Sequence, residues 1–168
     1  MKFKTLQRTL AAGVALQQSG QFDEAERQYA QVRRSAPNLF DGWYLSGTLA
    51  FHRGGHLEAA VEFLQRALRI DPRAGSAKLF LGMALADLGR FAEAEQPLRA
   101  ALLKLPGYAE AWDNLAKILA ETGRSAEAGD CRRRALALPR DQAGRAEPFA
   151  DRPTVAGAET LLLRMSPP

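Results

Sequence analysis

The stretch FAEAEQPL, at residues 91–98, occurs in altered form three more times in this chain. The other copies are FDEAERQY at 22–29, HLEAAVEF at 56–63 and SAEAGDCR at 125–132. Their shared alanines lie 35, 34 and 34 residues apart and are Ala25, Ala60, Ala94 and Ala128. Self-similarity at a fixed period of this length is the signature of a repeat protein. The chain is therefore expected to be an array of similar units.

Three other series of residues keep the same period. They are the glycines Gly20, Gly55, Gly89 and Gly123, the small residues Gly13, Gly47, Gly82 and Ala116, and the prolines Pro37, Pro72, Pro106 and Pro139. Because four independent series share one period, the sequence predicts four units. Their expected ranges are about 6–39, 40–74, 75–108 and 109–139.

Each unit has the pattern of two short helices. The third unit shows two apolar stripes at helical spacing, formed by Leu81, Gly82, Leu85 and Leu88, then by Ala94, Leu98, Ala101 and Leu102. Gly89 ends the first helix as a C-terminal glycine can, and Pro106 closes the second. The one extra residue of the second unit is expected in a turn at Gly54–Gly55, since glycine accepts unusual dihedral angles at little cost.

The composition favours an all-helical protein with a packed core. The 168 residues are 46% hydrophobic and 25% charged, which excludes disorder throughout the chain. Aromatic residues are only 8%, and the abundant alanine, leucine and arginine are strong helix formers. One cysteine excludes an internal disulfide, and with two histidines it is too few for a closed structural zinc site.

The repeated pattern resembles the tetratricopeptide repeat, whose unit of about 34 residues has a W-x₂-L-G start, an A-x₃-F middle and a late proline. The resemblance covers roughly residues 6–139. The start is carried by Trp43 to Gly47, with Ser46 where leucine is usual, and by Trp112 to Ala116. The middle is carried by Ala25 to Tyr29, Ala60 to Leu64 and Ala94 to Leu98. The resemblance implies an α-solenoid, a right-handed superhelix of antiparallel helix pairs, that acts as a non-catalytic adaptor or scaffold.

The first and last units depart from the family pattern. Thr9 replaces the opening aromatic residue of the first unit, and Ser125 and Arg132 replace apolar residues of the fourth. A repeat stack needs a polar outer face where it stops, so the fourth unit is expected to be the last.

The family geometry places a partner-binding groove on the first helices of the units. The groove residues that this implies are Leu10, Val14, Tyr44, Thr48, Phe51, Leu79, Phe80, Met83, Asp113, Asn114, Lys117 and Glu121. The groove would have an apolar floor over three units and an acidic-leaning end at the fourth. It suits a peptide or amphipathic helix with a basic residue at one end. The alternative is that these side chains simply fill a tightly curved inner surface.

The sequence offers no carrier for catalysis, and we expect no enzyme activity, cofactor or metal. His52 and His56 are four residues apart, but the predicted turn at Gly54–Gly55 separates them. Cys131 lies among charged residues with no histidine base nearby in the sequence. The phosphate-binding and hydrolytic motifs G-x-x-x-x-G-K-[ST], G-x-S-x-G and H-E-x-x-H do not occur.

Two rival functions remain at this point. A net charge of +4 and a pI near 9.6 raise nucleic-acid binding through arginines. Many of these arginines, however, fall near the ends of second helices, where a cation meets the negative helix terminus, and no aromatic residues are interleaved with them. The other rival is a regulatory or substrate-recruiting module for a separately encoded enzyme, such as a glycosyltransferase or sulfotransferase.

The repeat signal stops after Pro139. Residues 140–153 have the composition of a polar linker, and residues 154–165 have one apolar helical face formed by Val155, Ala158, Leu161, Leu162 and Met165. This segment could occupy a groove of its own chain or of a second copy, which would give self-association. It could instead cap the last unit or stay disordered.

No stretch reaches the roughly 18 apolar residues of a membrane-spanning helix. The basic N-terminus superficially imitates a secretion signal, but its apolar run, Leu10–Leu16, is short and is followed by Gln17 and Gln18. We expect a soluble, cytoplasmic protein.

Overall fold

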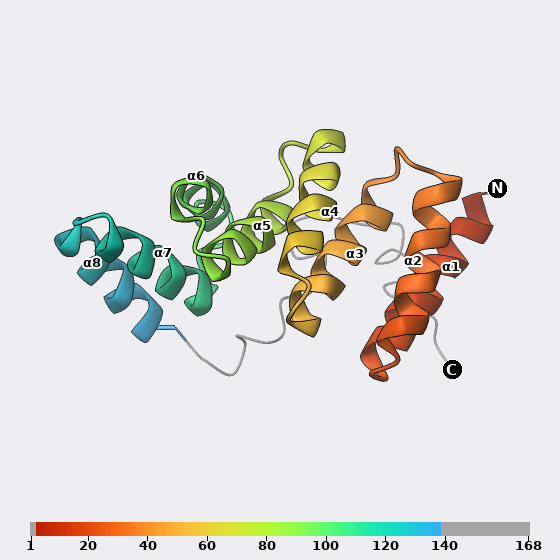
Figure 1. Ribbon diagram of the computed structural model, residues 1–168, viewed down its shortest axis with the longest axis horizontal. Helices are drawn as coiled ribbons and strands as arrows, with labels where there is room; N and C mark the ends of the chain where they lie inside the picture. The colour runs from red at the N-terminus through yellow and green to blue at the C-terminus, as the bar shows by residue number, and fades with distance from the viewer. Residues whose placement is uncertain (1–2, 139–168) are drawn as a thin grey trace, which may run out of the picture. The chain divides into compact units, whose positions relative to one another are not determined.

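The computed structural model describes residues 3–138, and these residues form eight α-helices and no strand (Figure 1). The prediction of an all-helical protein is therefore confirmed. The helices are α1 (Phe3–Gln18), α2 (Phe22–Ser35), α3 (Phe40–Arg53), α4 (Leu57–Ile70), α5 (Gly75–Asp87), α6 (Phe91–Leu102), α7 (Ala109–Glu121) and α8 (Ser125–Leu136).

The helices are short. The longest, α1, has 16 residues, whereas a bilayer-spanning helix needs about 20. Within residues 3–138 no helix is both long and apolar enough to cross a membrane. Helix α6 is also short, and it continues through Pro97 without a break.

The described helices form two compact bodies. The N-terminal body contains α1–α4, and the C-terminal body contains α5–α8. Within each body, consecutive helices pack as pairs joined by turns of three residues: α1 with α2, α3 with α4, α5 with α6, and α7 with α8. A second set of contacts joins the pairs, α2 with α3 in one body and α6 with α7 in the other. Each body is thus two stacked helical hairpins.

Glycine sets the spacing between the helices of a pair. A Cβ atom on Gly82 of α5 would lie 2.5 Å from Leu98 Cγ and 3.1 Å from the Leu98 backbone nitrogen. A Cβ atom on Gly47 of α3 would lie 2.6 Å from Leu64 Cγ. Such distances are too short for a carbon contact, so the side chain of the second helix occupies the space that a Cβ would need. The predicted close approach at Gly82 is present in the structure.

The turn at Gly54–Gly55 uses glycine for its backbone. Their φ angles are 62° and 67°, in the left-handed region that other residues rarely adopt. Gly54 follows directly after α3, which has one residue more than α5 and α7. The turn that follows, 54–56, has three residues like the other three turns, so the extra residue lengthens α3, and the expectation that the turn absorbs it is wrong.

Each of the two tryptophans forms a hydrogen bond between the start of a first helix and the preceding loop. The Trp43 Nε1–H donates to the Pro37 carbonyl, and the Trp112 Nε1–H donates to the Pro106 carbonyl, each at 2.8 Å. An arginine of the following second helix lies over each ring: Arg66 at 5.7 Å from Trp43 and Arg134 at 4.8 Å from Trp112. At the start of α3 and of α7, the tryptophan of the repeat pattern therefore interacts directly with the proline that precedes it.

Candidate partner-binding faces

The predicted groove residues belong to two faces, one on each body. We call them the N-terminal face, formed by α1 and α3, and the C-terminal face, formed by α5 and α7. The N-terminal face holds Leu10, Val14, Tyr44, Thr48 and Phe51. The C-terminal face holds Leu79, Phe80, Met83, Asp113, Asn114, Lys117 and Glu121.

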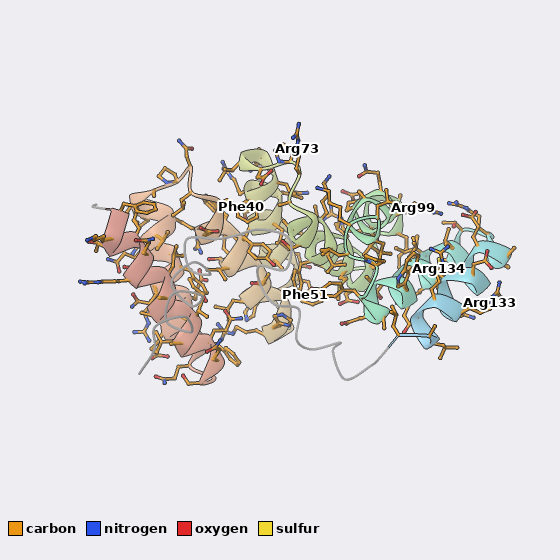
Figure 2. All side chains as sticks on the ribbon, turned by 180° about the vertical axis from the view of Figure 1, so that it is seen from behind. Phe40, Phe51, Arg73, Arg99, Arg133 and Arg134 are labelled. Atoms are coloured by element: carbon orange, nitrogen blue, oxygen red, sulfur yellow. The ribbon has the colours of Figure 1, made fainter. Side chains whose placement is uncertain are left out.

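Most of the N-terminal face is well packed. Leu10, Tyr44 and Thr48 are buried, whereas Val14 and Phe51 are half-buried. The Tyr44 ring stacks on Phe40 with 5.3 Å between centroids, and the Thr48 hydroxyl donates to the Leu45 carbonyl. Figure 2 labels Phe51 near the end of α3, and this half-buried ring is the largest side chain of the face that is not fully buried.

Helix α5 is apolar on all sides. Every one of its 13 residues except Lys78 and Asp87 is buried. Gly82, Leu81 and Leu85 form the side packed on α6, because Leu98 of α6 sits against Gly82. Phe80 lies on the side of the helix opposite Gly82, Met83 lies about 100° round the helix from Gly82, and both are only 3% exposed. Two opposite sides of one short helix are therefore apolar and buried.

The α7 part of the C-terminal face carries polar and charged side chains. Asp113 and Asn114 are half-buried, and Lys117 and Glu121 are exposed. The Lys117 ammonium lies 5.6 Å from the centroid of the Phe91 ring, where α6 begins.

Negative charge gathers at this end of the C-terminal face. Partial burial raises the pKa of Glu110, and the charges of Asp87 and Asp113 raise it further. Partial burial also raises the pKa of Asp87, while Lys117 acts in the opposite direction. Three carboxyl groups from α5 and α7 therefore share one region next to the apolar side of α5.

The surroundings of one largely covered arginine were missed by sequence reasoning. The Arg33 side chain, on α2, is 13% exposed and lies between the rings of Trp43 and Phe63, at 5.4 and 4.3 Å from their centroids. Its guanidinium donates to the Ser46 hydroxyl and, at 2.8 Å, to Glu26 Oε1. The available signal was Ser46, a polar residue where the family pattern has leucine.

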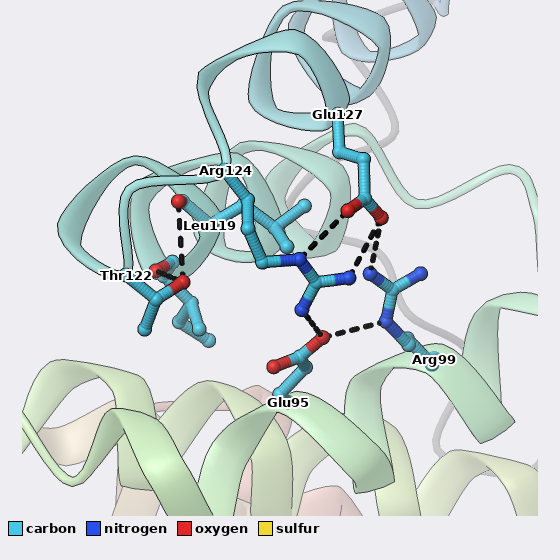
Figure 3. A network of polar contacts seen from close by, with 7 residues as sticks. Glu95, Arg99, Leu119, Thr122, Arg124 and Glu127 are labelled. Atoms are coloured by element: carbon cyan, nitrogen blue, oxygen red, sulfur yellow. Dashed lines mark hydrogen bonds and ion pairs between the residues drawn. The ribbon is translucent and has the colours of Figure 1, made fainter.

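Four charged side chains link α6 to α8, as Figure 3 shows. Arg99 Nε and Arg124 Nη1 lie 2.8 and 2.6 Å from the same oxygen of Glu95. Arg99 and Arg124 also pair with Glu127, at 2.9 and 2.7 Å. These ion pairs favour the charged guanidiniums, so the pKa values of both arginines are raised. The sequence interpretation placed Arg99 at a helix end, and the structure adds specific partners from the neighbouring repeat.

The surroundings of Cys131 do not activate its thiol as a nucleophile. The residue is buried, and this burial raises the pKa of its thiol, although Arg99 and Arg134 act in the opposite direction. The protonated thiol is the poorer nucleophile. No group of three histidine, cysteine, aspartate or glutamate residues that could hold a metal ion occurs within residues 3–138. The predicted linker, 140–153, and the apolar segment, 154–165, lie outside the described residues.

Comparison with known families matches three models, each described as a tetratricopeptide repeat, at residues 10–75, 53–113 and 111–146. No curated protein sequence matches the chain. Solved structures do match in fold. A crystal structure of MamA has a TM-score of 0.70 at 19% identity, covering 83% of this chain and 81% of that one. Another MamA structure, AMB-1, has a TM-score of 0.67 at 25% identity, covering 77% and 70%. YrrB, described as a TPR protein with an unusual peptide-binding site, has a TM-score of 0.65 at 24% identity, covering 82% and 72%.

Proposed function

Because this chain belongs to the tetratricopeptide repeat family, we propose that it is a protein–protein interaction adaptor that docks a helical segment of a partner protein on its first-helix faces. The tetratricopeptide repeat is generally a non-catalytic interaction module. YrrB, which shares the fold, is described as having a peptide-binding site. These relatives support a protein partner, and the choice of face rests on the residues of this chain.

The observation that carries the proposal is the apolar surface of the first helices α3 and α5. A helix at the surface of a small body is normally apolar on one stripe, which it buries against its neighbours. In α5 the side against α6 includes Gly82, with Leu79 and Leu85 three residues before and after it, and Phe80 and Met83 extend the apolar surface round the helix. These side chains are buried in the chain alone, so a partner helix would reach them only by displacing the groups that cover them, whereas Phe51 of the N-terminal face is half-buried and accessible to an amphipathic helix without that change.

The charges of the C-terminal face indicate the chemistry of the partner. Asp87 and Asp113 are near enough to Glu110 to raise the pKa of its carboxyl group, and Lys117 partly offsets the negative charge at Asp87. A partner helix with an apolar face and a lysine or arginine at one end would complement both the apolar side chains and the carboxylates of the C-terminal face. The charged pair would set the direction of binding and the rate of association more than the affinity.

The proposal is tested with a displayed library of 12-residue helical peptides selected against the full chain. The recovered peptides are titrated, by fluorescence anisotropy, into the wild-type protein and into Met83→Glu and Phe51→Glu variants. A carboxylate placed in an apolar contact opposes burial, so each peptide should bind at least about 10-fold more weakly to the variant of its own face.

A matched control is Leu103→Glu. Leu103 follows α6 and is 87% exposed, so the same change there adds a charge to solvent and should leave affinity unchanged. Circular dichroism checks that all three variants keep their helices. Undiminished binding to the Met83→Glu/Phe51→Glu double variant would show that the first-helix faces are not the docking site.

A further inference from the structure

Helix α1 extends the apolar surface of the N-terminal face beyond the residues that the sequence predicted. Phe3, Leu10 and Val14 follow the spacing of one helical face, so they form a single row along α1. Leu10 is fully buried, whereas Val14 is half-buried and Phe3 is 60% exposed. The row from Phe3 to Val14 is about 16 Å long. Accessible apolar surface therefore lies at both ends of this row.

Phe51 adds apolar surface on the neighbouring first helix. Helices α1 and α3 are in contact, and Phe51 occupies in α3 the repeat position that Gln17 occupies in α1. The half-buried Phe51 ring lies edge-on to the His52 ring, with 5.4 Å between centroids. Phe3 is close to the start of α1 and Phe51 is close to the end of α3, so the accessible surface runs along the length of these helices.

Two cations border the apolar row on α1. Lys4 and Arg8 are exposed, and they lie on the side of α1 away from Gly13, the residue that packs against Tyr29 of α2. Neither cation forms an ion pair with any residue between Phe3 and Leu138. Their charges are therefore available to a partner.

The helices of the N-terminal face offer no accessible negative charge to a partner. Helix α1 contains no acidic residue, and the acidic residue of α3, Asp41, is only 2% exposed. The C-terminal face differs, because Asp87, Glu110 and Asp113 gather there. The two faces therefore favour partner segments of opposite charge.

We propose that the N-terminal face selects an acidic amphipathic helix of a partner protein. The apolar row of that helix packs on Phe3, Val14 and Phe51, and aspartate or glutamate residues along one edge pair with Lys4 and Arg8. This inference rests on the proposed function, because it names the partner chemistry for one of the first-helix faces. Apolar burial supplies most of the affinity, and the exposed charge pairs supply selectivity and a faster association.

The test uses two fluorescein-labelled helical peptides that share one row of leucines. Glutamates border the row in the acidic peptide, and lysines border it in the basic peptide. Both are titrated into the full-length protein at low salt by fluorescence anisotropy. We expect wild type to bind the acidic peptide at least about 10-fold more tightly than the basic peptide, and we expect Lys4→Glu/Arg8→Glu to abolish or reverse this preference.

The matched control is Arg34→Glu/Arg69→Glu. This variant makes the same change in net charge on the second helices α2 and α4, where both arginines are exposed. It should keep the wild-type preference for the acidic peptide. Circular dichroism checks that both double variants keep their helices.

Two results would overturn the charge selection. The first is equal affinity of wild type for the two peptides or tighter binding of the basic one, and the second is an acidic preference that survives Lys4→Glu/Arg8→Glu. Phosphatidylserine vesicles provide a third: if they sediment wild type but not the Lys4→Glu/Arg8→Glu variant, the two cations belong to a membrane-binding surface and the proposal is wrong.

The Phe51→Ala variant separates this inference from the proposed function. Removal of the ring should weaken the binding of the acidic peptide, because apolar surface is lost from the contact. If both peptides bind wild type equally and both depend on Phe51, docking at this face stands and only the charge selection is lost. If neither peptide binds, or neither depends on Phe51, docking at the N-terminal face is wrong and the charge selection is lost with it.

Discussion

At the scale of single residues, the clearest determinant is the missing side chain at Gly82. A methyl group there would meet Leu98 Cγ at 2.5 Å and the Leu98 backbone nitrogen at 3.1 Å, so α5 and α6 would have to separate. We expect Gly82→Ala to lower the free energy of unfolding by about 1–3 kcal/mol, the usual cost of overpacking. Urea denaturation followed by circular dichroism measures this difference.

The control for that substitution is Gly107→Ala. No atom lies within 4 Å of a Cβ built on Gly107, and its backbone is not in the left-handed region. The Gly107→Ala midpoint should therefore match wild type. Equal midpoints for Gly82→Ala and wild type would mean that the helix spacing is not set by this glycine.

Tyr29 makes the free energy of unfolding of the N-terminal body depend on pH in the alkaline range. Its hydroxyl is buried and donates to Gln17 Oε1 at 2.9 Å, and burial, followed by the charge of Glu26, raises its pKa well above the ordinary 10.0. Above pH 10 the unfolded chain releases a proton that the folded chain keeps, so the free energy of unfolding falls as pH rises.

The Tyr29→Phe variant tests this linkage. At neutral pH it should lose about 1 kcal/mol, because the hydrogen bond to Gln17 is absent. Above pH 10 the gap between variant and wild type should narrow, since only wild type carries the Tyr29 proton. Urea midpoints measured from pH 7 to 11 decide the matter, and a constant gap would contradict the assignment.

At the scale of helices, the interface of α2 with α3 uses a polar pair where the C-terminal body uses an apolar one. Arg33 and Ser46 occupy the repeat positions that Leu102 and Leu115 occupy in α6 and α7. The guanidinium of Arg33 is held by Ser46, Glu26 and two aromatic rings. Arg33 stands where the other three units have Leu68, Leu102 and Leu136, and its partner Ser46 stands where the family pattern has leucine.

A double-mutant cycle with Arg33→Leu and Ser46→Leu tests this coupling. Each single change should cost about 1–3 kcal/mol, because it leaves a polar group in the interface without its partner. The double variant should be more stable than the sum of the single effects by about 0.5–3 kcal/mol. Additive losses would show that the two positions act independently.

The helix packing shows which features of the fold can be predicted from the sequence. The alanine, glycine, small-residue and proline series recur within about 35 positions, so they predict every hairpin and the close approach at Gly82. The surroundings of Arg33 depend on three helices at once, because Glu26, Ser46 and Phe63 come from α2, α3 and α4. Ser46 marked the position as unusual, but no pattern in one helix identifies its partner.

At the scale of the whole molecule, helical phase predicts which side of each first helix is available but not how much of it is covered. The predicted groove residues belong to α1 and α3 and to α5 and α7, and a groove formed by them stays a prediction. The burial of Phe80 and Met83 could not be predicted, since helical phase within α5 does not show what packs against its far side. For the same reason, the acidic grouping of Asp87 with Glu110 emerges only from the packing of α5 and α7.

The docking of a helical segment on the first-helix faces is tested most directly by photo-crosslinking. A library-selected peptide carrying one benzophenone group is irradiated with the full-length protein, and the attached residues are identified by mass spectrometry. We predict attachment to α5 around Met83 or to α3 around Phe51, and loss of the product when unlabelled peptide is in excess. Attachment to α2, α4, α6 or α8 instead would place the binding site on the second helices and contradict the assignment.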